Sequence, residues 1–327
     1  MRLRRYRSSS RRLTSSSLEL AVCRVQRRQG KTKGETIMDA MQKAIEQMRL
    51  WNGPAGRAWV ETQDILDEMF KQFERPLCEA VPAGSNRRVL DVGCGTGGLT
   101  VAVARKLGQG GRVVGIDISA PMIGAALARA EREGTSASFI CADAQHHKFD
   151  PASFDTIISR LGVMFFEDLV AAFANLRRAA AEGAGLAVVA WRGAAENPFM
   201  TAAERAAAPL LPNMPARPSG GPGQFAFADK DRVRTILLES GWTEIDIRPV
   251  DIPCRFPASE LARYVGWLGP VGTILQDADR GLRERVVDAV RPAFAPYVEA
   301  DAIRFTAACW MIQARASTDA AGEVSNG

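Results

Sequence analysis

The stretch "VLDVGCGTGG", Val89–Gly98, places four glycines among ten residues, and these glycines follow the run Arg87-Arg88-Val89-Leu90. It predicts a buried strand that ends in a glycine-rich turn, followed by a helix over Leu99–Leu107. Such a turn lets bare backbone approach a ligand, because glycine has no Cβ and adopts positive φ freely. The turn also fits the dinucleotide pattern G-x-G-x-x-G, so two ligands remain open at this point, NAD and S-adenosylmethionine.

Charge is distributed unevenly along the 327 residues. Residues 1–37 hold nine Arg and two Lys against Glu19 and Glu35, a charge of +9, so the +5 of the whole chain leaves −4 on residues 38–327. A nucleic-acid binder carries positive charge on its folded face, so we expect no nucleic-acid partner. No apolar run approaches the roughly 20 residues that span a bilayer, so we expect no membrane span.

Cysteine and histidine usage argues against a metal centre or a disulfide scaffold. The six cysteines are scattered without a C-x-x-C pair, and the only two histidines, His146 and His147, are adjacent. Neighbouring residues do not share a face of a strand or a helix, so this pair makes a poor metal site. We therefore predict no metal, reduced thiols and a cytoplasmic location.

Strand and helix signals alternate through the middle of the chain. This alternation predicts a parallel sheet with helices on both faces, and the last two strands fit an antiparallel pair. The expected strands are Arg88–Val92, Arg112–Asp117, Ala137–Cys141, Phe154–Ser159, Gly185–Trp191, Thr243–Val250 and Ile303–Ala314. The expected helices that accompany them are Leu99–Leu107, Pro121–Glu133, Asp168–Ala181 and Lys230–Ser240.

The flanking segments suggest a division into parts. Before the sheet, amphipathic helices are expected over Met38–Leu50 and Thr62–Val81, on either side of the turn-rich "WNGPAG", Trp51–Gly56. Residues 1–37 fit a disordered basic leader, either transit-peptide-like or preceding a true start at Met38. The predicted division is a leader at 1–37, an N-terminal helical cap at 38–86, the main α/β domain at 87–316 with lid insertions near 193–228 and 256–300, and a disordered tail at 317–327.

Acidic residues at strand ends separate the two candidate ligands. Asp117 closes the second strand about 20 residues after the turn, as either ligand requires. Asp91, two residues before Gly93, would repel a pyrophosphate but attract the ammonium of a methionine moiety. Asp143 follows the third strand, where an acceptor-only carboxylate can receive the amine of adenine.

Four segments, "VLDVGCGTGGLT", "GIDIS", "CADA" and "FDTIISRLGVMFF", together resemble the ordered motifs of class I S-adenosylmethionine-dependent methyltransferases. The resemblance is greatest to the small-molecule branch that includes the ubiquinone/menaquinone methyltransferases. It covers Met38–Ala316 and is strongest over Val89–Trp191. It implies a Rossmann-like, seven-stranded, mostly parallel sheet with an antiparallel last strand and helical cap insertions, and S-adenosyl-L-methionine as cofactor.

The resemblance also implies a role for particular residues. The backbone of Gly93, Cys94, Gly95 and Gly97 would face the methionine part of the cofactor, with Asp91 on the ammonium. Asp117 would bind both ribose hydroxyls through charge-assisted hydrogen bonds. The remaining cofactor residues would be Ile118 and Met122 packing on adenine, Asp143 and Ala144 at its edge, and Ser159 near the transferred methyl.

The acceptor is less defined by the sequence. "SRLGV" after the fourth strand departs from the Asn/Asp-Pro-Pro-aromatic run of methyltransferases that act on amino groups of DNA or protein. Aromatic residues in the lid segments favour a small apolar or aromatic metabolite, with Trp51, Arg160 and Met164 as candidate substrate residues. No catalytic residue is identified, and the nucleophile atom and oligomeric state stay open. The alternatives are an NAD-dependent oxidoreductase and a protein that binds S-adenosylmethionine without turnover.

Overall fold

The computed structural model describes Gln42, residues 45–215 and residues 221–317. The chain divides into two units, Met1–Glu46 and Gln47–Gly327, and the fold below is that of the second. The expected leader at 1–37 and residues 318–327 of the expected tail lie outside the described residues. Among the residues described, no helix combines the length and the apolar character needed to cross a bilayer.

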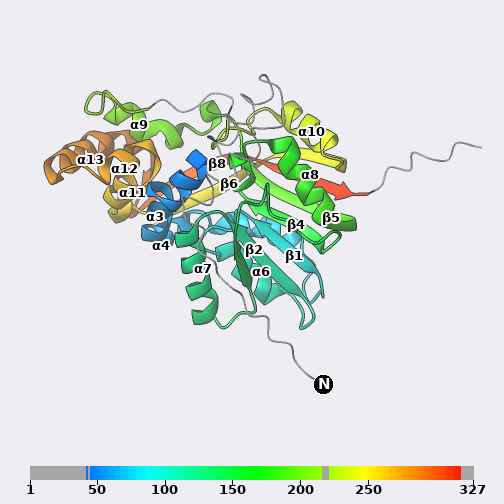
Figure 1. The fold of residues 1–327 in the computed structure, drawn as a ribbon. Coiled ribbons are helices and arrows are strands. Elements are labelled where there is room, and N and C mark those ends of the chain that lie inside the picture. Colours follow the sequence, from blue (N-terminus) through cyan, green and yellow to red (C-terminus); the bar gives the residue numbers. More distant parts are fainter. Residues whose placement is uncertain (1–41, 43–44, 216–220, 318–327) are drawn as a thin grey trace, which may run out of the picture. The chain divides into compact units, whose positions relative to one another are not determined.

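The sheet has the strand order β3-β2-β1-β4-β5-β8-β6 (Figure 1). Its first five members are parallel, while β8 runs antiparallel to both β5 and β6. The strands are β1 Arg88–Val92, β2 Arg112–Asp117, β3 Ser138–Cys141, β4 Phe154–Arg160, β5 Ala180–Trp191, β6 Thr243–Pro257 and β8 Ala302–Ala316. The expected mostly parallel α/β sheet is confirmed, with one addition, the two-residue strand β7 Val298–Glu299 paired to β8.

Four helices accompany the sheet: α6 Gly98–Lys106, α7 Ala120–Arg132, α8 Leu169–Ala179 and α10 Lys230–Glu239. Short polar side chains begin three of them. The side chains of Ser119, Asp168 and Asp229 accept hydrogen bonds from first-turn N–H groups of α7, α8 and α10. Because β2 and β5 lie on opposite sides of the β1–β4 pair, right-handed crossovers put α6 and α8 on opposite faces of the sheet.

The region before β1 differs from the expectation. Residues 47–52 are helical and α3, Pro54–Glu61, follows after the single turn residue Gly53, so "WNGPAG" is mostly helix rather than turn. Proline at the start of a helix lacks only an N–H that would be unpaired anyway, which explains Pro54. The single helix expected over Thr62–Val81 is broken into α4 Gln63–Met69, the 3-10 turn η1 Lys71–Phe73 and α5 Glu74–Glu79. Pro76 lies in the first turn of α5, where a missing N–H is tolerated, which favours a new helix start there over a continuous helix.

Two helical insertions complete the unit. The first, after β5, contains η3 Ala194–Glu196, η4 Pro198–Thr201 and α9 Ala202–Ala207; the second, after β6, contains η5 Ala258–Glu260, α11 Leu261–Trp267, α12 Gly269–Leu275, α13 Arg280–Phe294 and η6 Ala295–Tyr297. The antiparallel β6–β8 pair is confirmed, but these helices separate its strands, so it is not a tight hairpin.

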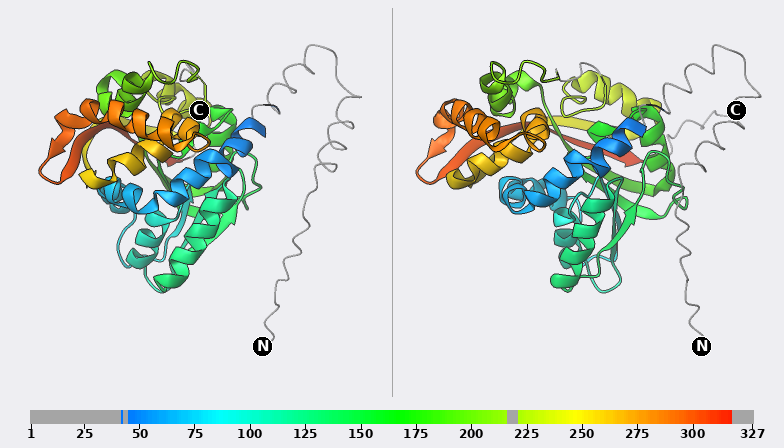
Figure 2. Two further views of the ribbon diagram at one scale, coloured as in Figure 1. Left: turned by 90° about the vertical axis from the view of Figure 1, so that its left-hand side faces the viewer. Right: turned by 60° about the vertical axis from the view of Figure 1, so that its left-hand side comes forward.

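The β6–β8 pair extends beyond the rest of the sheet. Pairing of β5 with β8 ends at Trp191–Cys309, whereas β6 and β8 stay paired from Asp251–Ala308 to Pro257–Ala302. Figure 2 shows the orange helices α12 and α13 gathered along this two-stranded extension, away from the teal helices of the parallel half. The second helical insertion is therefore carried on an extension of the sheet.

Candidate cofactor and acceptor site

The glycine-rich turn after β1 requires glycine for two different reasons. Gly93, Gly95 and Gly97 have φ of +66°, +55° and +80°, a region that side chains with Cβ rarely adopt. A Cβ on Gly93 would in addition lie 2.6 Å from the Cα of Gly162, whereas one on Gly95 meets nothing closer than 3.9 Å. The first position needs glycine for packing as well as conformation, and the second for conformation alone.

Asp117, at the end of β2, forms a hydrogen bond with the backbone of this turn. Its Oδ2 accepts a hydrogen bond of 2.9 Å from Gly95 N, and its Oδ1 accepts one of 2.9 Å from Ser119 N. The residue is 8% exposed, and burial raises the pKa of its carboxyl above the ordinary value. Each oxygen keeps a further lone pair, so the carboxylate can still accept two hydroxyl groups.

Asp91, at the end of β1, is almost fully buried, and only one of its two carboxylate oxygens has a hydrogen-bond partner. Its Oδ2 accepts a hydrogen bond of 2.7 Å from Thr100 Oγ1 in the first turn of α6, while its Oδ1 has no partner. Burial raises the pKa of this carboxyl to about 6. An unpaired buried carboxylate oxygen is unfavourable unless a cation or donor joins it, so the site is suited to an ammonium group.

Residues expected around adenine lie at the ends of β2 and β3, which are neighbours in the sheet. Asp143 is held in a turn, since its Oδ1 accepts from Gln145 N at 2.9 Å and its Oδ2 lies 2.7 Å from Nδ1 of His146. Ala144 and Met122 are buried and Ile118 is half-buried. The structure thus brings these side chains to one edge, with the Asp143 carboxylate already engaged by its own turn.

Ser159 and Arg160 end β4 with different surroundings. The buried Ser159 Oγ donates a 2.7 Å hydrogen bond to Val92 O and accepts one of 3.3 Å from Gly162 N, so this hydroxyl faces backbone. It holds the turn after β4 against β1. Arg160 places its guanidinium carbon 5.9 Å from the Phe70 ring centroid, and its Nη1 is buried without a hydrogen-bond partner.

The helical segment 47–52 is bonded to the loop between β2 and α7. Asn52 donates a 3.0 Å hydrogen bond to Ile118 O and accepts one of 2.9 Å from Ala120 N, while Ser119 Oγ donates to Trp51 O at 2.6 Å. The Trp51 ring meets Phe165 edge-on at a centroid separation of 4.9 Å. The sequence analysis missed Asn52, because nothing local in "WNGP" indicates a partner 66 residues away.

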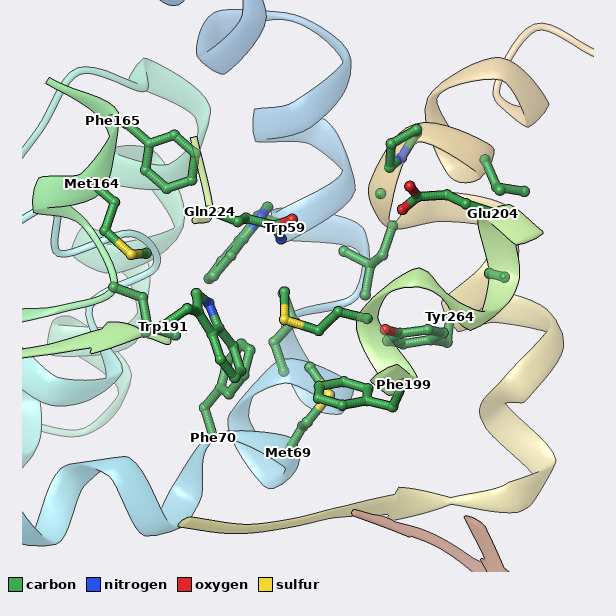
Figure 3. A pocket seen from close by; sticks show the side chains of 18 residues that line it. Trp59, Met69, Phe70, Met164, Phe165, Trp191, Phe199, Glu204, Gln224 and Tyr264 are labelled. Carbon is green, nitrogen blue, oxygen red and sulfur yellow. The ribbon is translucent and has the colours of Figure 1, made fainter. Parts of the chain in front are cut away.

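A cavity of about 110 Å³ is lined by 18 residues (Figure 3). Its wall is aromatic and rich in methionine, and Glu204, Gln224 and Tyr264 supply polar groups. The aromatic residues of the wall are Trp59, Phe70, Phe165, Trp191, Phe199 and Tyr264. Of the three candidate substrate residues, Met164 lines the cavity, Trp51 reaches it only through Phe165, and Arg160 is not part of the wall.

Trp59 of α3 connects this cavity to the glycine turn. It lines the cavity, and its Cε3 lies 4.0 Å from the position that a Cβ on Gly95 would occupy. A group bound over the turn would therefore have the cavity next to it.

Comparison with known proteins assigns the chain to a family. Residues 89–183 match the model described as a methyltransferase domain. The chain is 29% identical to nocamycin O-methyltransferase of Saccharothrix syringae over 217 residues, 61% of this chain and 74% of that protein. It is 34% identical to demethylmenaquinone methyltransferase of Thermus thermophilus over 103 residues, 32% of this chain and 46% of that protein. The chain is a class I S-adenosylmethionine-dependent methyltransferase.

A solved structure shows that the methyltransferase fold extends beyond the matched residues. Phosphoethanolamine N-methyltransferase 2 of Haemonchus contortus, in complex with phosphomonomethylethanolamine and S-adenosylhomocysteine, is 17% identical with a TM-score of 0.53. The similarity covers 83% of this chain and 59% of that one. S-adenosylmethionine is the cofactor of a methyltransferase of this class, and the comparisons give the NAD-dependent alternative no support. The buried, unpaired Asp91 oxygen fits this cationic cofactor and would oppose a pyrophosphate.

Proposed function

We propose that this methyltransferase transfers a methyl group to a small apolar or aromatic metabolite bound in the cavity beside the glycine turn. The observation that carries the proposal is the wall of six aromatic side chains and several methionines, with few polar groups. Such walls bind flat, apolar molecules. The names of two relatives support it, since nocamycin and demethylmenaquinone are small molecules. The negative charge of residues 38–327 argues against a nucleic-acid acceptor.

We assign the cofactor to the carboxyl ends of β1, β2 and β3. The positive-φ glycines Gly93, Gly95 and Gly97, with Cys94 between them, offer backbone to the methionine part, and Asp91 offers its free oxygen to the ammonium. Asp117 binds the ribose hydroxyls. Around adenine we place Ile118, Met122, Asp143 and Ala144, and near the methyl we place the backbone at Ser159. A bound cofactor supplies an electrophilic methyl on a cationic sulfur, and the chain aligns the acceptor with it.

Among the described residues that line the cavity, one carboxylate is a candidate for a base. Glu204 of α9 is the acidic residue among those that line the cavity, and it lies on the wall formed by the helical insertions (Figure 3). A hydroxyl or amine acceptor loses a proton on methylation, so a carboxylate at this place can accept it. We assign that role to Glu204, and we assign contact with the acceptor to Met164 and support of Phe165 to Trp51.

The helices around the cavity serve as its lid in this proposal. Three helical segments form it: residues 47–79 before β1, the insertion around 194–207 after β5, and the insertion around 258–297 after β6. All three contribute residues to the wall. This lid excludes water from the transferred methyl, which favours a reaction in which charge disappears. The five described cysteines are free thiols, consistent with the proposed cytoplasmic location.

Two measurements test the proposal. Calorimetric titration with S-adenosylmethionine and with NADH should give binding of the first alone. Incubation with methyl-labelled S-adenosylmethionine and a panel of phenols, quinols, aromatic acids and alkylamines should label a flat aromatic acceptor, with an Asp117→Ala variant as the inactive control. Binding of NADH in place of S-adenosylmethionine, or labelling of the alkylamines only, would refute it.

A further inference from the structure

The end of β4 carries an arginine with a buried nitrogen that makes no hydrogen bond within the described residues. Arg160 is the last residue of β4, and its Nη1 is buried with no hydrogen-bond partner. Its guanidinium group stacks over the Phe70 ring, which leaves the N–H groups free to donate. Arginine stays protonated in proteins, so this buried N–H group cannot be relieved by losing a proton. A buried donor of this kind is unfavourable until an acceptor reaches it.

An opposite charge lies beside it on the neighbouring strand. β1 and β4 are parallel neighbours in which Asp91 pairs with Ile158, and residues two apart on a strand share a face. Asp91 and Arg160 are therefore on the same face. The positive charge of Arg160 lowers the pKa of the Asp91 carboxyl, against the larger opposite effect of burial. Yet Oδ1 of Asp91 and Nη1 of Arg160 both lack a hydrogen-bond partner, so the two charges do not satisfy each other.

A structural arginine in this fold has different surroundings. Arg192, just beyond the end of β5, also stacks on an aromatic ring, with its guanidinium carbon 5.7 Å from the Trp310 centroid. Two acids form ion pairs with it, since its Nη2 lies 3.1 Å from Asp251 and its Nε 2.9 Å from Glu196, although this Nε is buried without a geometrically formed hydrogen bond. Arg160 has an aromatic partner of the same kind but no such acid bonded to its Nη1.

The positions of Asp91 Oδ1 and Arg160 Nη1 indicate which ligand could form hydrogen bonds with both atoms. Asp91 precedes Gly93 by two residues, Arg160 precedes Gly162 by two, and these glycines meet, since a Cβ on Gly93 would lie 2.6 Å from Gly162 Cα. The two charges thus flank the turn assigned to the methionine part of the cofactor. Arg160 is absent from the cavity wall, which argues against the acceptor as its partner.

We propose that Arg160 binds the carboxylate of the methionine end of the cofactor, while Asp91 binds its ammonium. The planar guanidinium fork matches a carboxylate, and a charge-assisted bond of this kind is stronger than a neutral one. Arg160 then makes the enzyme selective for cofactors that carry a carboxylate. This inference rests on the proposed function, because it assigns a residue to the cofactor site described there.

The test compares S-adenosylmethionine with decarboxylated S-adenosylmethionine, which keeps the sulfonium, the adenosine and the amine. Isothermal titration calorimetry on the full chain should give wild-type protein about tenfold or greater preference for the carboxylated ligand, as loss of a charged hydrogen bond implies. Arg160→Met should bind the two ligands equally. Arg160→Lys, which keeps the charge but loses the fork, should show an intermediate preference.

The matched control is Arg192→Met, which removes an arginine with an aromatic partner from the neighbouring strand end and should keep the wild-type preference. Thermal melting of each variant checks that it is folded; if Arg160→Met is unfolded, the lowered preference of Arg160→Lys decides. An Arg160→Met or Arg160→Lys variant that keeps the full preference overturns the inference and leaves the proposed function standing. Wild-type protein that binds neither ligand overturns both.

Discussion

The cofactor edge and the acceptor cavity are built in different ways. At the cofactor edge, backbone N–H groups and positive φ angles dominate, and the residues assigned to it come from short segments after successive strands. The cavity is lined by side chains from α3, α4, β5, α9, α11 and α12, which are widely separated in the chain (Figure 3).

The two regions differ in how far apart along the sequence their interacting residues lie. The cofactor edge follows from strand register, because parallel neighbours bring the ends of β1, β2 and β4 together without further information. The cavity depends on how helices from distant segments pack, so single residues of its wall can change without altering the edge. The variants below test how separate the two regions are, in order of decreasing effect on folding and cofactor binding.

The largest effect is expected at Gly93. Gly93→Ala combines a positive φ with a Cβ at 2.6 Å from Gly162, and should lower the free energy of unfolding by about 3 kcal/mol or more and abolish cofactor binding. Gly84→Ala is the matched control, since Gly84 has φ of +67° but open space around its Cβ position, and should cost only about 1 kcal/mol. Chemical denaturation measures both. Equal losses in the free energy of unfolding for the two variants would show that the close approach of Gly93 to Gly162 does not contribute to stability.

Asp117→Ala should come next. It removes a carboxylate that supports Gly95 and accepts from the ribose, so cofactor affinity should fall tenfold or more. Asp155→Ala is the control, because Asp155 forms an ion pair with Arg88 at the opposite end of the strands. This variant should bind the cofactor with the affinity of the wild type. Calorimetric titration with S-adenosylhomocysteine separates the two. Unchanged affinity in Asp117→Ala would contradict the ribose assignment.

Asp91 should give the enzyme a dependence on pH. Its carboxyl has a pKa of about 6 in the folded protein, above the ordinary 3.8, so below pH 6 it is protonated and cannot pair with an ammonium. Cofactor affinity should fall roughly tenfold for each pH unit below about 6 and be level above it. The same group makes the ligand-free protein less stable as pH rises from about 4 to about 6, since only the folded state binds the proton there.

Asp91→Asn provides the check on this prediction. It has no titratable group at the site, so its cofactor affinity should lose the step near pH 6, and calorimetry in buffers of different ionisation enthalpy should show no proton release on binding. A step near pH 6 that persists in Asp91→Asn would assign the dependence to another group.

A smaller effect is expected at Asn52, which links helical residues 47–52 to the loop that follows Asp117. Asn52→Ala loses three side-chain hydrogen bonds at an exposed position: two to the loop, to Ile118 O and from Ala120 N, and one to Met48 O in its own helix. Cofactor dissociation should be severalfold faster, with a loss of about 1 kcal/mol in affinity. Stopped-flow fluorescence of the nearby tryptophans measures the rate. Asn86→Ala, which removes an exposed bond to Gly110 N remote from the site, should leave it unchanged.

A substitution in the cavity wall should lower the rate of methyl transfer without changing the affinity for the cofactor. Glu204→Gln keeps the size of the side chain but removes the proposed base, so the rate of methyl transfer to a hydroxyl or amine acceptor should fall about a hundredfold. Cofactor affinity should be that of wild type. A loss of cofactor affinity in this variant would show that the two regions are coupled.

The sequence predicts the strands that form the proposed cofactor edge, and one of the residues that line the cavity, Met164. The bounds expected for the first two strands, Arg88–Val92 and Arg112–Asp117, are those of the structure, because alternation and glycine punctuation are local signals. Thr100 and Asn52 were missed, since an ordinary helix residue and an isolated asparagine acquire their roles only from partners in the folded chain. Arg160 was predicted to contact the substrate, whereas we propose a contact with the cofactor, because its Nη1 is buried and unpaired.

The extension of β6 and β8 has an evolutionary consequence. Both ends of the second insertion leave from one short antiparallel ribbon, where Pro257 pairs with Ala302. Replacing residues 258–301 with the corresponding segment of a relative would change one wall of the cavity and leave unchanged the strand ends to which we assign the cofactor. A change of acceptor therefore requires exchange of only one segment, joined to the sheet at a single ribbon.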